Sequence, residues 1–236
     1  MMPDPSTLLI LALVLPVMGL LLTLVVGGRY AGHIALLLML VGLAVAAAMV
    51  VSVVRADDAL IYPLGGWIPP LGVALRADGL SAIFILTTAV VVGATGIFAR
   101  AEFRTLPGQP ETRTSLTFWA LLLTLWGALN LVFLSNDLFS LFVALELLTF
   151  SAIPLVCLSG RAETLAAGLR YLLFALFGSV LYLLGAVLLY GAYGTLDIGL
   201  LAERVRPEPV TWAVAALMTV GLMAKTAVFP LHFWLP

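Results

Sequence analysis

Residues 138–158 read LFSLFVALELLTFSAIPLVCL, an apolar run in which Glu146 is the one charged residue. A helix that crosses a bilayer needs about 20 mostly apolar residues, and this run is long enough. Comparable runs, bounded by charged residues or by Gly and Pro, occupy residues 7–26, 34–54, 80–98, 116–134, 165–190 and 210–228. The sequence therefore predicts an all-α fold, a polytopic transmembrane bundle of about seven helices.

Composition excludes several classes of protein. The chain has 236 residues, of which 63% are hydrophobic and 10% charged, whereas a soluble domain carries about 25% charged residues. A net charge of -1 supplies no basic stripe for phosphates, so nucleic acid is not expected as a partner. The single cysteine, Cys157, cannot form an internal disulfide or a metal site and is expected to pack. The sequence also has no Gly-rich phosphate loop and no Cys or His cluster, so we expect no cofactor and no metal on this chain.

The segments outside the runs predict a short hairpin and carry a weak signal for the orientation of the chain in the membrane. Residues 62–79 are rich in Gly and Pro and indicate a hairpin or ordered loop outside the membrane core. The leader before the first run has no basic residue, so that run is expected to be a membrane helix rather than a signal peptide. If the N-terminus lies outside, the inside loops hold Arg29, Arg100, Arg104, Arg113 and Arg161, and the outside loops hold Arg55, Arg76, Arg204 and Arg206. This small excess inside favours an outside N-terminus. The expected location is a cell inner (plasma) membrane.

The acid Glu146 and the base Lys225 both lie within apolar runs. Glu146 stands near the middle of residues 138–158, and Lys225, the one lysine of the chain, lies in the last run. A charge at the centre of a membrane helix costs about 2.5–3.5 kcal/mol by insertion scales, so such side chains face the bundle interior and usually have a partner. A low dielectric disfavours the charged form of both an acid and a base, which suits groups that exchange protons. The alternative is a purely structural pair that locks two helices together.

Two other polar side chains, His232 and Arg170, have two interpretations each. His232 follows Pro230, where irregular backbone at membrane depth must be covered by protein or water. It is either a proton relay or an interfacial histidine beside aromatic residues. Arg170 either extends its head group to the membrane surface or acts as a fixed charge near Glu146. His33, at the start of the second run, is expected at the interface. Gly178 and Gly185 are expected to allow close helix packing.

Four stretches together resemble a known family. They are residues 65–70 with 76–81 (RADGLS), residues 144–148 (ALELL), residues 169–173 (LRYLL) continuing to 189–196, and residues 224–236 (AKTAVFPLHFWLP). The chain is similar to the antiporter-like membrane subunits of respiratory complex I, membrane-bound hydrogenases and Mrp-type sodium/proton antiporters. The resemblance covers most of the chain in the family's order. One departure is Arg170, where many relatives carry a lysine.

The resemblance implies a larger architecture, of which this sequence contains the first half. The family fold has about fourteen helices, with two inverted repeats at helices four to eight and nine to thirteen. Residues 1–114 would hold helices one to three with the hairpin, and residues 115–236 would begin the proton-translocating repeat with helices four to seven. The relay residue of helix eight and the second repeat lie outside this sequence. We expect either a fragment of a longer product or one half of a split subunit.

The resemblance also implies a function and partners. Glu146 and Lys225 would form a switchable pair that carries protons, and redox chemistry would occur on other membrane subunits of the complex. The leading hypothesis is a proton-translocating subunit of a redox-driven complex of the NADH–quinone oxidoreductase type, with no redox centre of its own. A subunit of a cation (sodium)/proton antiporter and a truncated, non-transporting scaffold are the alternatives.

Overall fold

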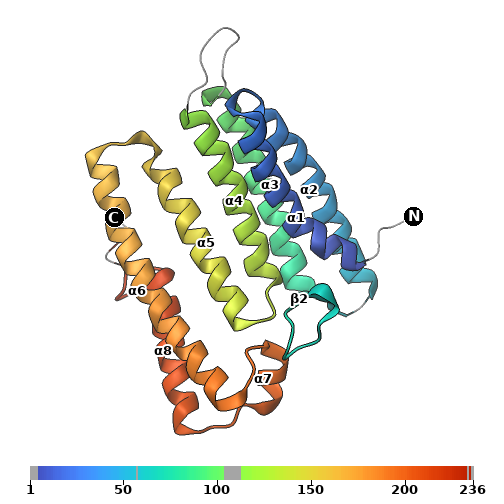
Figure 1. Ribbon diagram of the computed structural model, residues 1–236, viewed down its shortest axis with the longest axis vertical. Helices are drawn as coiled ribbons and strands as arrows, with labels where there is room; N and C mark the ends of the chain where they lie inside the picture. The colour runs from blue at the N-terminus through green and yellow to red at the C-terminus, as the bar shows by residue number, and fades with distance from the viewer. Residues whose placement is uncertain (1–4, 57, 104–112, 233, 235–236) are drawn as a thin grey trace. The chain divides into compact units, whose positions relative to one another are not determined.

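The computed structural model describes residues 5–56, 58–103, 113–232 and 234, and they form a helical membrane protein (Figure 1). The helices are α1 (Pro5–Val26), α2 (Gly28–Ala56), α3 (Gly79–Glu102), α4 (Arg113–Leu134), α5 (Leu138–Val156), α6 (Ala162–Tyr193), α7 (Ile198–Arg204) and α8 (Pro209–Lys225). Within the described residues, six helices are long and apolar enough to cross a membrane, and α8 is a shorter apolar helix. The predicted all-α membrane fold of about seven long helices is confirmed.

Several helix boundaries differ from the sequence prediction. Helix α2 begins at Gly28 rather than near residue 34, because Gly27, with a φ of 91°, completes the turn from α1 in one residue. The segment predicted as a loop at 197–209 contains the short helix α7, whose first turn is capped by Asp197 through a 2.9 Å bond from the backbone N–H of Leu200. Helix α8 ends at Lys225, three residues before the predicted end of the run.

The predicted hairpin is confirmed. Strands β1 (Leu60–Pro63) and β2 (Ala74–Ala77) form a two-stranded sheet. The connection contains a 3-10 turn at Leu64–Gly66, closed by a 3.4 Å bond from the N–H of Trp67 to the carbonyl oxygen of Leu64. A 2.8 Å bond from the N–H of Leu64 to the carbonyl oxygen of Val73 joins the two sides of the hairpin. Gly65 and Gly66 adopt φ values of 66° and 79°, which side chains with a Cβ rarely adopt. This explains why glycines stand at the tip.

Asp78 fixes the start of α3. Its carboxylate accepts a 2.9 Å hydrogen bond from the backbone N–H of Ser81, in the N-cap position. That backbone hydrogen bond holds the pKa of Asp78 below its usual value of 3.8. The turn between the hairpin and α3 is therefore stabilised by a charged cap.

By packing, the described helices form two compact units, α1–α4 with the base of the hairpin, and α5–α8 with the hairpin tip Pro63–Ala74. In the first unit, α4 buries Trp119 and Trp126, and the side-chain amide of Asn130 donates a 2.7 Å bond to the carbonyl oxygen of Ala12. A Cβ on Gly42 would overlap the ring of Trp126, so this glycine lets α2 approach α4. Packing places α4 with α1–α3, whereas the expected start of the functional repeat at residue 115 stays a prediction.

In the second unit, α6 and α8 approach closely through glycines. A Cβ on Gly178 would lie 2.7 Å from the carbonyl oxygen of Gly221, and one on Gly221 would lie 2.9 Å from the backbone nitrogen of Tyr182. Tyr182 also ties α6 to α5, because its hydroxyl donates a 3.2 Å bond to the carbonyl oxygen of Leu138. Small residues therefore bring two helix backbones into contact, as expected for Gly178.

A clamp of polar groups joins the start of α5 to the start of α7. Asp137 caps α5 with 2.9 Å bonds from the backbone N–H groups of Phe139 and Ser140. The Asn136 side chain instead donates a 2.8 Å bond to the carboxylate of Asp197, and the carbonyl oxygen of Asn136 accepts a 2.9 Å bond from the N–H of Ile198. Asp137 therefore caps α5, and Asn136 holds the start of α7.

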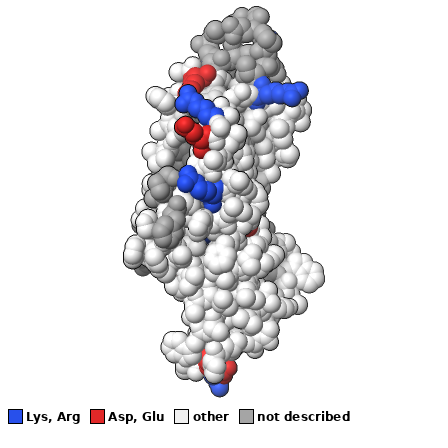
Figure 2. All heavy atoms as spheres, turned by 90° about the vertical axis from the view of Figure 1, so that its left-hand side faces the viewer, with Lys and Arg blue, Asp and Glu red and all other residues white. Residues whose placement is uncertain are grey.

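Much of the surface is apolar. Large hydrophobic side chains such as Leu40, Ile97 and Phe177 are exposed. Figure 2 shows one face on which most of the visible side chains are uncharged. Such a surface is stable in lipid rather than in water.

The glycine contact between α6 and α8 gives a testable prediction. Gly178→Ala should lower the stability of the purified complex by about 1–3 kcal/mol, because backbone atoms of α8 must move to admit the methyl group. Gly191→Ala, in the same helix, is the matched control, since a Cβ there meets nothing within 4 Å. Thermal unfolding in detergent measures both, and equal melting temperatures of the two variants would contradict the close approach.

The cap at α3 gives a second prediction. Asp78→Ala should cost about 1 kcal/mol of stability, whereas Asp78→Asn should cost less because an amide oxygen still accepts the bond. Since the pKa of Asp78 is lowered from 3.8 in the folded chain, the charged cap contributes above that value and its contribution is lost as the pH falls through the folded-state pKa. The difference in melting temperature between wild type and Asp78→Ala should therefore shrink in acid. A difference that does not change below about pH 4 would show that the charge contributes nothing.

Candidate functional site

The structure brings Glu146 and Lys225 together as an ion pair. The Lys225 Nζ lies 2.9 Å from the Glu146 Oε1, and the side chains are 9% and 15% exposed, respectively. Glu146 lies near the middle of α5 and Lys225 is the last residue of α8. Glu146 and Lys225 are therefore each other's partner, within one compact unit of the chain.

Two hydroxyl groups complete the surroundings of the pair. The Ser179 hydroxyl on α6 donates to the Oε1 of Glu146 and also lies 2.8 Å from the carbonyl oxygen of Ala175 in its own helix. A hydroxyl carries one hydrogen, so Ser179 donates to one of these acceptors at a time. The Thr149 hydroxyl lies 3.5 Å from the Lys225 Nζ and donates a 2.9 Å bond to the carbonyl oxygen of Leu145. It can therefore present a lone pair to the ammonium.

Helix periodicity explains this arrangement. Glu146 and Thr149 are three residues apart and lie on the same face of α5, and Thr149 is buried. On α6, Ser179 follows Gly178, the residue at the closest approach to α8. The same contact that brings α8 against α6 therefore places Lys225 beside α5, so the site depends on the packing of all three helices.

The end of α8 is defined by its own hydrogen bonds. Ala227 has a φ of 51°, and the N–H of Val228 donates a 3.2 Å bond to the carbonyl oxygen of Met223, which is the pattern of a Schellman motif. Glycine is usual at this left-handed position, so the alanine here adds strain. The motif ends the helix at Lys225, where the negative end of the helix dipole favours a cation.

Trp234 returns to α8 after the break. Its indole Nε1 donates a 2.9 Å bond to the carbonyl oxygen of Ala224, and its ring stacks on Tyr171 of α6 at 4.4 Å between centroids and 13° between planes. Carbonyl groups in the last turn of a helix have no partner within the helix. Trp234 supplies one of them with a donor and fixes the segment after α8 against α6.

The other two candidate residues are His232 and Arg170. His232 is half-buried in the segment after α8, with its ring 5.6 Å from that of Phe229. Arg170 is exposed on α6, nine residues before Ser179. At 3.6 residues per turn and 1.5 Å per residue, that spacing puts Arg170 on the opposite side of α6 and about 13 Å along it. The structure thus pairs Glu146 with Lys225 and separates Arg170 from the residue of α6 that contacts them. The functional roles of all four residues stay predictions.

Sequence reasoning missed Ser179 and Thr149. A single hydroxyl in an apolar helix commonly bonds to its own backbone, so neither residue stands out in the sequence. The position of Ser179 next to Gly178 was the available signal, because a helix contact made through a glycine also brings the neighbouring side chain to the interface.

The arrangement is suited to moving a proton and holds few groups suited to other chemistry. It combines one acid, one base and two hydroxyls in an apolar layer. Among the described residues, no group of three or more His, Cys, Asp or Glu side chains is positioned to hold a metal ion. The Ser179 hydroxyl has two acceptors within reach, the Glu146 carboxylate and the carbonyl oxygen of Ala175.

The family of the chain follows from comparison with known proteins. Residues 135–236 match the family model described as NADH:quinone oxidoreductase/Mrp antiporter, TM. The matched region begins one residue after α4 ends and contains Glu146, Ser179 and Lys225.

Relatives extend the similarity toward the N-terminus. A Na(+)/H(+) antiporter subunit of Alkalihalophilus pseudofirmus is 32% identical over 215 residues, which are 88% of this chain and 42% of that protein. An NADH-quinone oxidoreductase subunit of Desulforudis audaxviator is 34% identical over 81% of this chain and 38% of its own length. The chain thus spans less than half the length of the curated relatives it matches.

A solved structure shows the same fold. It is described as the membrane-bound sulfane sulfur reductase (MBS), an archaeal respiratory membrane complex, and one of its chains matches with a TM-score of 0.85 and 28% identity. The match covers 96% of this chain and 46% of that one. The fold, the relatives and the matched motifs agree, and the chain belongs to the NADH:quinone oxidoreductase/Mrp antiporter family of transmembrane subunits.

Proposed function

We propose that the chain is a proton-translocating subunit of a multi-subunit membrane complex and that the Glu146–Lys225 pair carries the proton. The observation that carries this proposal is the 2.9 Å contact between the Nζ and the Oε1 of the two residues, on separate helices in an apolar layer. A structural ion pair needs no alternative partners for its members. Here Ser179 and Thr149 stand beside the pair and can satisfy it in more than one state.

The mechanism is electrostatic. While Glu146 is charged and close, it stabilises the ammonium of Lys225. If Glu146 takes up a proton or is drawn away, Lys225 loses its counter-charge in a low-dielectric layer and releases its proton. The Ser179 hydroxyl can then turn from the carboxylate to the carbonyl oxygen of Ala175, 2.8 Å away. When the charge of Glu146 returns, Lys225 takes up the next proton.

Two further residues have proposed roles. His232 follows Lys225 along the chain in irregular backbone, and its imidazole is a suitable relay for the released proton. Arg170 lies on the opposite side of α6 from the pair, so its effect would be that of a fixed positive charge at a distance, weaker than a direct contact. Both roles are secondary to that of the pair.

We propose a redox-driven complex of the NADH–quinone oxidoreductase type as the setting. Redox cofactors would belong to partner subunits, and electron transfer there would move Glu146 relative to Lys225. Other membrane subunits of the complex are the expected partners, in a cell inner (plasma) membrane with the N-terminus outside. The similarity to the Desulforudis audaxviator oxidoreductase protein supports this setting.

A cation/proton antiporter is the second candidate. It is supported by the similarity to the Alkalihalophilus pseudofirmus antiporter protein, which extends over more of the chain than the similarity to the oxidoreductase protein. The complex purified through this chain and reconstituted in vesicles separates the two. Proton uptake driven by NADH and a quinone would identify the redox setting, and uptake driven only by a sodium gradient would identify the antiporter.

The sharpest test of the pair is Lys225→Arg. Arginine keeps the positive charge and can still contact Glu146, but it does not release a proton in proteins. Proton translocation by the assembled complex should fall roughly 100-fold, the scale of a lost proton-transfer group. Glu146→Gln and Lys225→Ala should be equally impaired, while Glu146→Asp should retain part of the activity because the acid remains.

Assembly must be measured separately from transport. A Lys225→Arg complex that contains all its subunits and translocates protons at the normal rate would establish a structural pair and defeat this mechanism. An assembled, inactive complex supports it. Comparing Lys225→Arg with Lys225→Ala also separates loss of charge from loss of the exchangeable proton.

Ser179→Ala tests the positioning role of the hydroxyl. The carboxylate of Glu146 would lose a hydrogen-bond donor, so translocation should fall by about tenfold. Ser151→Ala is the matched control, because Ser151 is also buried in an apolar helix but donates to the backbone of its own helix, at Leu147 and Leu148. Translocation by Ser179→Ala at the same rate as Ser151→Ala would show that the Ser179 hydroxyl does not act on Glu146.

A further inference from the structure

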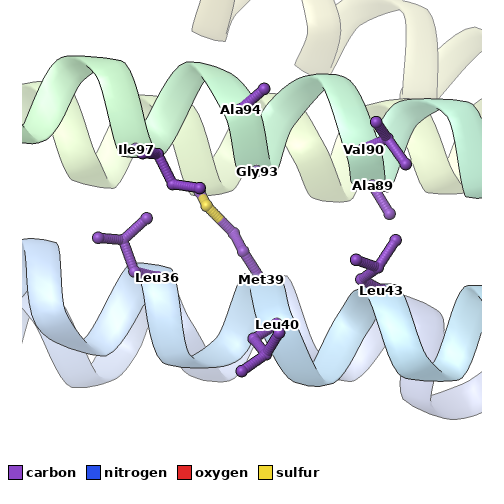
Figure 3. A pocket seen from close by; sticks show the side chains of 9 residues that line it. All are labelled: Leu36, Met39, Leu40, Leu43, Ala89, Val90, Gly93, Ala94 and Ile97. Carbon is purple, nitrogen blue, oxygen red and sulfur yellow. The ribbon is translucent and has the colours of Figure 1, made fainter.

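An apolar groove runs between α2 and α3 in the first unit (Figure 3). Its cavity volume is about 400 Å³, within the range of small-molecule sites. The lining residues are Leu36, Met39, Leu40, Leu43, Ala89, Val90, Gly93, Ala94 and Ile97. In Figure 3 the groove lies between the two helices, with Gly93 on its α3 side. Any occupant must therefore be apolar along this length.

One end of the groove carries a pair of polar side chains. The Arg100 Nη2 lies 3.1 Å from the His33 Nε2. Arg100 is one turn beyond Ile97 on α3, and His33 is one turn before Leu36 on α2, so the pair lies just past the lining residues. A guanidinium can only donate, so the imidazole nitrogen accepts, and the other N–H groups of Arg100 can reach an anion. Both side chains are exposed.

The length of this arrangement matches one leaflet of a bilayer. From His33 to Leu43 there are ten residues, which advance about 15 Å along a helix. The hydrocarbon core of a bilayer is about 30 Å thick, so one leaflet is about half of that. A group held at His33 and Arg100 would therefore sit at the headgroup level while a chain reached Leu43 and Ala89 near the midplane.

We propose that this groove binds one acyl chain of an anionic phospholipid, with the phosphate held by Arg100. Phosphate suits Arg100 because guanidinium N–H groups match two phosphate oxygens at once. The imidazole of His33 holds the guanidinium at the mouth of the groove. Arg29, one turn before His33, adds positive charge, and Glu102, two residues after Arg100, offsets part of it. The site is independent of the Glu146–Lys225 pair and lies in the other unit of the chain.

The groove can be filled without disturbing the helix. A Cβ on Gly93 meets nothing within 4 Å, and replacing a helical glycine with leucine favours the helix. Gly93→Leu should therefore occupy the space of the acyl chain while the protein folds normally. Arg100→Gln removes the anion-binding charge at the mouth. Arg55→Gln is the control, because Arg55 is an exposed arginine at the other end of α2.

The experiment uses phosphatidylglycerol with a photoactivatable group in the acyl chain, added to the assembled complex in nanodiscs. Peptide mapping should find cross-links in α2 and α3 at the groove. Arg100→Gln should lower their yield by about fivefold, the effect of one basic side chain near a membrane surface. Gly93→Leu should abolish them without lowering the melting temperature, and Arg55→Gln should leave them as in wild type.

Several outcomes would overturn the proposal. Equal labelling by the same probe with a phosphatidylcholine headgroup would show that the site does not distinguish an anionic headgroup from one without net charge. Loss of labelling in excess inorganic phosphate would show that Arg100 binds a free anion rather than a lipid. Labelling of Gly93→Leu at the wild-type level would place the chain elsewhere. Absence of groove cross-links in the wild-type complex would mean that a partner helix covers this face.

Discussion

A charge in an apolar layer needs an opposite charge beside it, and the second half of this chain is arranged around one such ion pair. The ammonium of Lys225 and the carboxylate of Glu146 come from different helices, and neither side chain is more than 15% exposed. Removing water from both groups costs more than an exposed ion pair returns, so the pair persists only where the geometry is close and further hydrogen bonds help. Ser179 and Thr149 supply those bonds. Helices α5, α6 and α8 must therefore pack in one register for the site to exist.

The helix break after Lys225 contributes to the same ion pair. Because α8 ends there, the ammonium lies at the negative end of a helix dipole as well as beside a carboxylate. The end is held by the Val228–Met223 bond and by Trp234, which is stacked on Tyr171 of α6. A displacement of α6 would thus act on the site at Ser179 and on the end of α8 through Trp234. The break couples the position of one helix to the surroundings of the lysine.

The fold could be predicted from the sequence because hydrophobic length is a direct signal in a membrane protein. Residues 138–158 and the six other runs indicated the long helices, and the glycines and prolines of residues 62–79 indicated the hairpin. Helix ends were less well predicted. The end of α8 depends on Ala227 at a φ of 51°, and an alanine in the sequence does not indicate a left-handed backbone conformation. Helix α7 depends on the Asp197 cap, a signal that one aspartate within a polar loop does not distinguish from an ordinary turn.

The residues of the site also fall into two groups, those that the sequence indicates and those that it does not. Glu146 and Lys225 stand out because charge is rare in apolar runs. An unpaired charge there is costly, so the sequence indicates that each needs a partner. Ser179 and Thr149 do not stand out, since hydroxyls are inexpensive in helices. Yet these two hydroxyl groups decide whether Glu146 and Lys225 can separate. Two charges without other partners would be locked together, because separating them leaves both uncompensated. A hydroxyl that can donate either to Glu146 or to the carbonyl of Ala175 lowers the cost of the separated state, and a proton carrier requires that the separated state be accessible.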